Sequence, residues 1–270
     1  MRFGAPIFDK YENAEEWAAV HKKYGYNAAY CPINDKDQLH LKDEYIRACE
    51  KYDIVIAEVG AWSNPMSLDA DNRKTAVEHC QSRLYVADEM GANCCVNIAG
   101  NLGESWDGHS SENLTERAFD AIVETTRAII DAVKPKRTYY TLEMMPWMYP
   151  YDDDTYIKLI KAIDREHFAV HLDIANTINS PLRYYSIPKI IKDCFAKLGG
   201  YVKSIHVKDI TMTQGMTTHL NEILLGKGNF DYATLVSEVK KLNADIPLML
   251  EHLATKEEYL EAGDHLKKFF

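Results

Sequence analysis

The strongest constraint on the fold of this chain is a repeated alternation of short β-rich runs and longer amphipathic stretches along its 270 residues. Each short run is rich in β-branched, aromatic or other apolar residues and ends at turn-forming residues. The runs are almost continuously apolar, which is typical of parallel strands covered by helices. The predicted strands are residues 2–7, 27–31, 54–59, 94–98, 138–144, 169–174, 204–207 and 248–251.

The stretches between these strands have helical periodicity. Cys80, Leu84 and Ala87, for example, fall on one apolar stripe. Eight strand–helix units in this length predict a single domain over residues 1–270 with an α/β fold, a closed (β/α)₈ TIM barrel, which typically needs ~250 residues. A doubly wound parallel sheet is the structural alternative, but no G-x-G-x-x-G follows the first strand. The predicted helices are residues 14–24, 43–52, 72–90, 111–132, 153–164, 188–198, 232–242 and 256–268.

The charge of the chain argues against several classes of partner. Lys and Arg total 31 and Asp and Glu total 41, so the formal net charge is −10, with no basic block. This argues against nucleic acid and against an anionic membrane surface. No apolar run approaches ~18 residues, so no transmembrane helix is expected. No apolar signal segment follows Met1 and the six cysteines form no C-x-x-C pair, so we expect a cytoplasmic protein with free thiols.

Charged or imidazole groups interrupt the apolar runs near the ends of the last four predicted strands. These groups are Glu143, Asp173, His206 and Glu251. The carboxyl ends of barrel strands meet at one face, so the four side chains should converge there. Three buried carboxylates would repel one another, and a divalent cation would relieve this repulsion. The alternative is four unrelated polar residues, each satisfied by its own partner.

The donor set indicates which metal ion would bind. Three carboxylates and one imidazole favour one Mn²⁺ or Mg²⁺, with Co²⁺ and Zn²⁺ as the alternatives. Four protein ligands leave about two octahedral positions for substrate oxygens.

The residues around these four groups carry a family resemblance that covers essentially the whole chain. It rests on Leu142-Glu143, Leu172-Asp173-Ile174, His206-Val207-Lys208-Asp209 and Leu250-Glu251, with Gly226-Lys227-Gly228 before the seventh helix. The ordered set resembles the xylose isomerase-like TIM barrels, the superfamily of sugar phosphate isomerase/epimerases, hydroxypyruvate isomerases, inosose dehydratases and endonuclease IV. The resemblance implies a divalent metal held by Glu143, Asp173, His206 and Glu251.

The resemblance also implies a reaction. In the epimerase branch the two metal-bound glutamates form the acid/base pair, which here corresponds to Glu143 and Glu251 as catalytic residues. One would remove the proton beside a carbonyl and the other would return it, through an enediolate. We therefore expect an isomerase or epimerase acting on a sugar, sugar phosphate or keto-polyol. A lyase of the inosose dehydratase type is the alternative on the same metal site, and a non-catalytic sugar-binding barrel is the alternative of another class.

This chain departs from its relatives at two positions near the site. Asn176 stands where many relatives have a histidine, and Lys208 lies near the position where ketose 3-epimerases tend to have an arginine. Both departures argue against a direct ketose 3-epimerase assignment. The ends of the predicted strands three and four offer Trp62 and Asn97 rather than histidines, which disfavours the histidine-rich trinuclear zinc site of endonuclease IV.

Six residues are candidates for contacts with the substrate: Lys208, Asn176, His171, Asn97, Trp62 and Trp147. For His171 a role in the barrel core is the equal alternative. His252 should face away from Glu251 and is interpreted as structural. The Gly226–Gly228 segment favours a tight turn over a phosphate cradle, and Trp106 fits either a pocket or a homo-oligomer interface.

Overall fold

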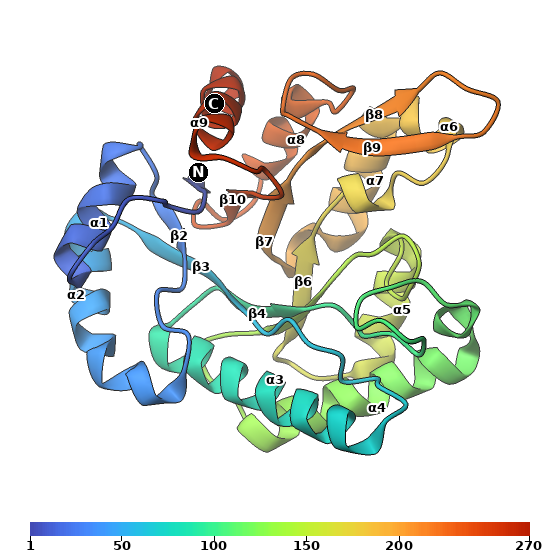
Figure 1. The fold of residues 1–270 in the computed structure, drawn as a ribbon, viewed down its shortest axis with the longest axis horizontal. Helices are drawn as coiled ribbons and strands as arrows, with labels where there is room; N and C mark the ends of the chain where they lie inside the picture. Colours follow the sequence, from blue (N-terminus) through green and yellow to red (C-terminus); the bar gives the residue numbers. More distant parts are fainter.

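The computed structural model describes residues 1–270 and shows an eight-stranded parallel barrel surrounded by helices (Figure 1). The strand order is β1-β10-β7-β6-β5-β4-β3-β2, with parallel pairing throughout. The predicted TIM barrel is therefore confirmed, and the doubly wound alternative is excluded. The barrel strands are β1 (Arg2–Gly4), β2 (Ala28–Tyr30), β3 (Val55–Gly60), β4 (Cys94–Asn97), β5 (Tyr140–Glu143), β6 (Phe168–Leu172), β7 (Val202–Val207) and β10 (Pro247–Leu250).

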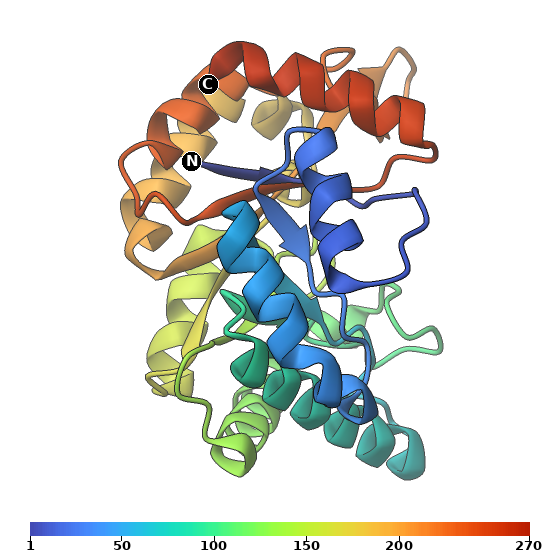
Figure 2. The same ribbon diagram turned by 90° about the vertical axis from the view of Figure 1, so that its left-hand side faces the viewer.

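The helices lie outside the barrel, and α1, α2 and α9 flank the strands near both chain ends (Figure 2). The α-helices are α1 (Ala14–Lys23), α2 (Lys42–Tyr52), α3 (Ala70–Met90), α4 (Glu116–Val133), α5 (Asp153–Ile163), α6 (Pro181–Tyr184), α7 (Ile187–Leu198), α8 (Tyr232–Val239) and α9 (Lys256–Leu266). Short 3₁₀ turns are η1 (Lys36–Leu41), η2 (Ser111–Leu114), η3 (Ala175–Thr177), η4 (Gly199–Tyr201) and η5 (Lys267–Phe269).

The barrel is nearly closed at a seam between β1 and β2. At this seam the backbone N–H of Asn27 donates to the carbonyl of Phe3 at 3.0 Å. The Asn27 side chain in turn accepts from the backbone N–H of Phe3 at 2.7 Å. A Cβ on Gly4 would lie 2.2 Å from the carbonyl oxygen of Ala28, so only glycine allows the two backbones to approach this closely.

Two predicted segments differ from the structure. The helix expected over 111–132 is η2 followed by α4, because the Thr115 side chain accepts from the N–H of Ala118 and begins a new helix there. The connection over 209–230, for which the sequence predicts neither strand nor helix, contains an antiparallel hairpin of β8 (Asp209–Thr213) and β9 (His219–Ile223). This hairpin lies beside the carboxyl ends of the barrel strands (Figure 1).

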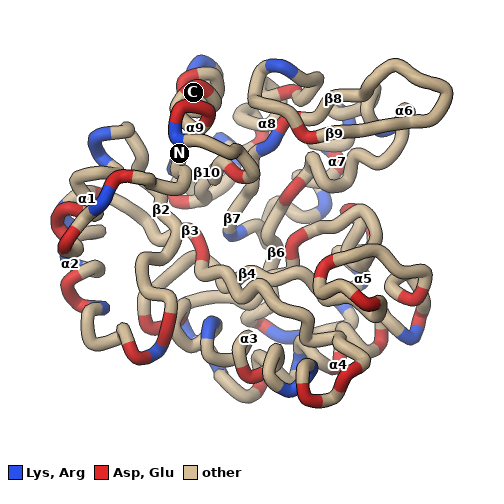
Figure 3. The backbone as a smooth tube through the Cα atoms, viewed as in Figure 1, with Lys and Arg blue, Asp and Glu red and all other residues tan.

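The molecule has a continuous apolar core of 61 buried residues, which packs the helices onto the barrel. The barrel interior also contains buried polar side chains, among them Glu58, His171 and His206. Acidic and basic residues are interspersed over the outer helices (Figure 3), consistent with the absence of a basic block. No helix combines the length and the apolar character that crossing a bilayer requires.

Candidate active site and metal centre

The four expected metal ligands come together at the carboxyl ends of four neighbouring strands. Glu143 ends β5 and His206 lies in β7, whereas Asp173 and Glu251 directly follow β6 and β10. One donor atom from each lies within 4.8 Å of the others. Glu143, Asp173 and His206 are buried, and the Glu251 side chain is 16% exposed. The convergence that strand order predicts is therefore present in the folded chain.

His206 directs one ring nitrogen into this cluster. Its Nδ1 lies 3.2 Å from Glu143 Oε1 and 3.0 Å from Glu251 Oε2. Burial opposes the charge of the imidazole, but Glu251, Glu58 and Glu143 raise the pKa of His206 well above its usual range. The cluster thus attracts positive charge at the position of Nδ1.

Lys208 supplies a second positive group to the cluster. Its Nζ lies 2.9 Å from Asp173 Oδ2, 2.8 Å from Glu251 Oε2 and 3.3 Å from the side-chain oxygen of Asn176. The side chain is only 2% exposed. Burial alone would lower the pKa of Lys208, but the surrounding carboxylates raise it well above the usual range. Lys208 therefore acts here as a fixed ammonium.

The two glutamates have different electrostatic surroundings. Burial and the charge of Glu251 raise the pKa of Glu143. Burial also opposes ionisation of Glu251, but His206 and Lys208 hold the pKa of that carboxyl well below its ordinary value. Two carboxyl groups whose pKa values are shifted in opposite directions are typical of acid/base pairs.

The donor set fits a divalent cation. Asp173 Oδ2 and Glu251 Oε2 are buried and accept no hydrogen bond, although Lys208 Nζ is near both. Buried carboxylate oxygens with unused acceptor capacity are costly unless a cation satisfies them. Three carboxylates and one imidazole are ligands that Mn²⁺ or Mg²⁺ accepts. Buried acidic and imidazole groups of this chain could therefore hold a metal ion.

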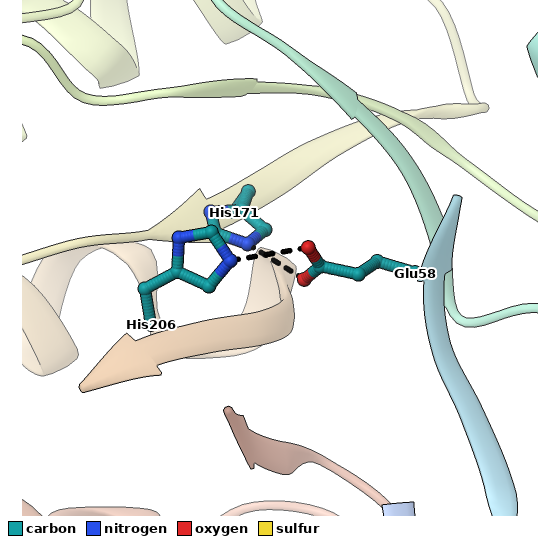
Figure 4. A group of neighbouring side chains, drawn as sticks. All are labelled: Glu58, His171 and His206. Carbon is teal, nitrogen blue, oxygen red and sulfur yellow. Dashed lines mark hydrogen bonds and ion pairs between the residues drawn. The ribbon is translucent and has the colours of Figure 1, made fainter. Parts of the chain in front are cut away.

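A second buried cluster consists of Glu58, His171 and His206 and shares His206 with the first (Figure 4). Glu58 in β3 contacts His206 Nε2 at 3.1 Å and His171 Nε2 at 2.9 Å. Ser204 also donates to Glu58, at 2.9 Å. Burial would raise the pKa of Glu58, but the two imidazoles lower it below its ordinary range. An ionised Glu58 accepts a hydrogen bond from His206 Nε2–H, so that Nδ1 is the ring nitrogen that would bind a metal ion.

A cavity of about 830 Å³ opens directly above the first cluster. Glu143, Glu251 and Asn176 lie on its floor, and Trp62 and Trp147 lie on its walls. Asn176 also donates to Glu143 Oε1 at 3.2 Å and to the carbonyl of Met144 at 3.0 Å, which fixes the amide beside the cluster. Three of the six expected substrate-binding residues therefore line this cavity, and Lys208 lies beneath it.

The other two expected substrate-binding residues are fully buried and do not line the cavity. His171 contacts Glu58, which matches the alternative interpretation as a core residue. The side-chain oxygen of Asn97 accepts from the N–H of Ser63, and its amide nitrogen donates to Cys80 Sγ. Neither residue has exposed surface in this structure, and the expected direct contact with substrate stays a prediction for both.

Glu222 and His252 are among the residues that line the cavity although sequence reasoning did not assign them to it, and Trp106, left open between a pocket and an oligomer interface, lines it as well. His252 has φ of +57°, so the chain turns after β10 and strand alternation no longer applies to it. Its Nδ1 contacts Glu222 at 2.9 Å. Glu222 lies on β9, in the hairpin for which the sequence predicts neither strand nor helix. Neither the turn nor the hairpin has a clear signal in the sequence.

The Gly226–Gly228 segment forms a tight turn, as expected, and its N–H groups are already used. Gly226 and Gly228 both donate to Asp209 Oδ2, at 2.8 and 3.0 Å. Phe230 and Ile210 donate to Asp209 Oδ1. The buried Asp209 carboxylate thus occupies the position that a phosphate would need.

Together these features define a TIM-barrel protein with a carboxylate-rich candidate metal centre at the carboxyl ends of its strands. The chain belongs to the xylose isomerase-like TIM barrel family, whose sequence profile matches residues 18–269. A curated relative, an uncharacterized protein of Methanocaldococcus jannaschii, is 23% identical over 245 residues, which cover 89% of this chain and 75% of the relative.

Solved structures show the same fold at low sequence identity. The probable 3-DHS dehydratase AsbF of Bacillus anthracis has a TM-score of 0.72 at 15% identity, over 99% of this chain and 98% of its own. The 3-keto-D-glucoside 4-epimerase of E. coli has a TM-score of 0.69 at 13% identity, over 99% of both chains. A Mycobacterium smegmatis family member in complex with magnesium has a TM-score of 0.65 at 15% identity, over 96% of this chain and 88% of its own.

Proposed function

We propose that this protein is a divalent-metal-dependent isomerase or epimerase that moves a proton within a keto sugar or keto-polyol. The observation that carries the proposal is the position of Glu143 and Glu251. Both carboxylates lie on the floor of the cavity, and both contribute to the cluster of four donor atoms. The fold neighbours named as an epimerase, a dehydratase and a magnesium complex support the same class of chemistry.

In this proposal Glu143, Asp173, His206 and Glu251 hold the metal ion, with Mn²⁺ or Mg²⁺ favoured by the donor set. A bound divalent ion polarises a carbonyl and stabilises the negative charge that develops on its oxygen. Glu143 and Glu251 serve as the acid/base pair: one takes the proton from the carbon beside the carbonyl and the other returns one. Asn176 binds a substrate hydroxyl next to Glu143, and Lys208 keeps Asp173 and Glu251 in place.

The first experiment measures metal content and proton exchange together. The protein is stripped with EDTA and reloaded with Mn²⁺ or Mg²⁺, and its metal content is determined by elemental analysis. A panel of ketoses is then incubated with it in D₂O and followed by NMR. We expect about one ion per chain and deuterium entering beside the carbonyl. No metal after reloading would contradict the proposed site, and loss of water without exchange would favour the lyase.

Glu251→Gln tests the proton-transfer role. The amide keeps the size of the side chain but cannot act as a general base, so we expect exchange to fall by roughly 10²–10⁴-fold. Glu261→Gln on α9 is the matched control, since Glu261 is exposed and pairs only with Lys227. Circular dichroism establishes that both variants are folded. Full exchange activity in Glu251→Gln would rule out this residue as acid or base.

A further inference from the structure

The mouth of the barrel contains two cavities that meet at Glu251. The second, of about 620 Å³, lies on the side of β1 and β2 and is lined by Tyr11, Tyr30 and Asn34, among others. Trp62, Glu251 and His252 line both cavities. A substrate that reacts beside Glu251 therefore has space on both sides of the reacting carbon.

Neither cavity has a lysine or an arginine on its walls. The charged residues that do line them are acidic, apart from His252 and His21: Asp107, Glu143, Glu222 and Glu251 in the first, and Glu58 and Glu251 in the second. Proteins hold phosphate and carboxylate groups with Arg, with Lys or with free backbone N–H groups. Anionic substrate groups thus have no cationic partner on these walls.

The cationic and N–H groups closest to the site are already engaged. Lys208 is 2% exposed and lies between Asp173 and Glu251. The N–H groups of Gly226 and Gly228 donate to Asp209. Arg183 donates from Nε to the carbonyl of Thr177, its Nη2 is buried without a hydrogen-bond partner, and the residue lines neither cavity. A phosphate ester would therefore meet mainly carboxylates.

The first cavity is lined by aromatic side chains and by no lysine or arginine. Trp62, Trp106 and Trp147 are 40, 46 and 36% exposed, and all line the first cavity. Trp62 is held against the backbone, since a Cβ on Gly60 would come within 2.5 Å of its Nε1. Trp147 Nε1 donates to the carbonyl of Asp107 at 2.9 Å. Fixed apolar ring faces next to a few amide and hydroxyl groups favour uncharged ligands such as sugars.

We propose that the substrate is an uncharged keto sugar joined to a second uncharged sugar unit. The reacting ring lies over Glu143 and Glu251 in the first cavity. The second unit extends past Trp62 and His252 into the second cavity, towards Tyr11 and Asn34. The inference rests on the proposed function, because the proposed acid/base pair defines which end of the substrate reacts.

Binding to the Mn²⁺-loaded protein, measured by titration calorimetry, tests this inference independently of turnover. The probes are D-fructose, D-fructose 6-phosphate and three ketose disaccharides with different linkages: turanose, maltulose and isomaltulose. We expect at least one disaccharide to bind about tenfold more tightly than D-fructose, and the phosphate ester to bind no more tightly than D-fructose. The inference is overturned if D-fructose 6-phosphate binds more tightly than D-fructose. It is also overturned if none of the three disaccharides binds more tightly than D-fructose.

Tyr11→Ala locates the second unit. We expect this change to reduce the preference for the disaccharide over D-fructose, because Tyr11 lines only the second cavity. Tyr201→Ala is the matched control, since Tyr201 precedes β7 at the opposite end of the barrel. Asn34→Ala provides a second variant in the same cavity. An unchanged preference in both cavity variants contradicts the placement. If the protein binds no metal ion, or catalyses no deuterium exchange with any ketose, that result would contradict the proposed function instead.

Discussion

His206 has two ring nitrogens, and the structure gives each a different environment. Nε2 faces the buried carboxylate of Glu58 (Figure 4). Nδ1 instead lies near the carboxylates of Glu143 and Glu251. A histidine that donates its second N–H to a carboxylate is held in one tautomer and one orientation. Glu58 is thus a positioning residue for the proposed metal ligand.

Glu58→Gln tests this role. The amide retains the volume of the side chain but places a neutral group beside His206. We expect the dissociation constant for Mn²⁺ to rise roughly 10–100-fold, the usual effect of losing such a partner. Titration calorimetry measures the affinity, and ¹⁵N NMR of the imidazole reports its tautomer. Glu89→Gln on α3, outside the barrel, is the control. Unchanged affinity and tautomer in Glu58→Gln would refute the role.

The contribution of Glu58 was hard to predict because its partners are far away in the sequence. His171 lies 113 positions and His206 lies 148 positions along the chain. The four candidate ligands were easier to predict, since each interrupts an apolar strand near its carboxyl end. Barrel geometry then brings those ends together. No comparable rule indicates which buried carboxylate faces which imidazole across the barrel interior.

At the scale of elements, the hairpin β8–β9 and the following turn are held together by one carboxylate. Asp209 accepts from the N–H groups of Ile210, Gly226, Gly228 and Phe230, at 2.8–3.0 Å. This side chain is 1% exposed. It therefore connects the start of the hairpin to the segment that leads into α8.

Asp209→Ala removes the acceptor for these four donors. Each unsatisfied N–H costs about 1–3 kcal/mol, and local opening of the turn relieves part of this cost. We expect a loss of about 2–4 kcal/mol in the free energy of unfolding, measured by urea denaturation. Amide exchange should become faster at residues 226–230. Asp193→Ala on the exposed face of α7 is the control. Exchange rates unchanged by Asp209→Ala would show that the turn does not depend on this residue.

The elements themselves were largely predictable because their patterns are strong. All eight barrel strands overlap their predicted ranges, and parallel strands covered by helices leave a nearly continuous apolar signal. The hairpin was missed because β9 is largely exposed and polar, so it resembles a loop. The orientation of the His252 side chain could not be predicted, because a positive φ in a non-glycine residue has no signal in the sequence.

At the scale of the whole molecule, the proposed metal ion would join four strands. A ligand that binds only the folded state stabilises it by about 2.7 kcal/mol at one hundred times its dissociation constant. For a chain of 270 residues this corresponds to an increase in Tm of about 5 °C. Calorimetry with Mn²⁺ and again after EDTA measures the difference. Equal Tm values under both conditions would argue against metal binding at this site.

The pairing of the first barrel strand with the last has a consequence for biosynthesis. The first strand, β1, lies beside the last, β10 (Figure 2), and Phe3 has Leu248 as its partner in the register. While the chain emerges from a ribosome, β1 can contact β2 early, but it cannot pair with β10 until Pro247–Leu250 have been translated. Glu251 directly follows that last strand. A nascent chain therefore lacks the fourth candidate donor until β10 has been translated, so the candidate metal site and the barrel would be completed in the same late step.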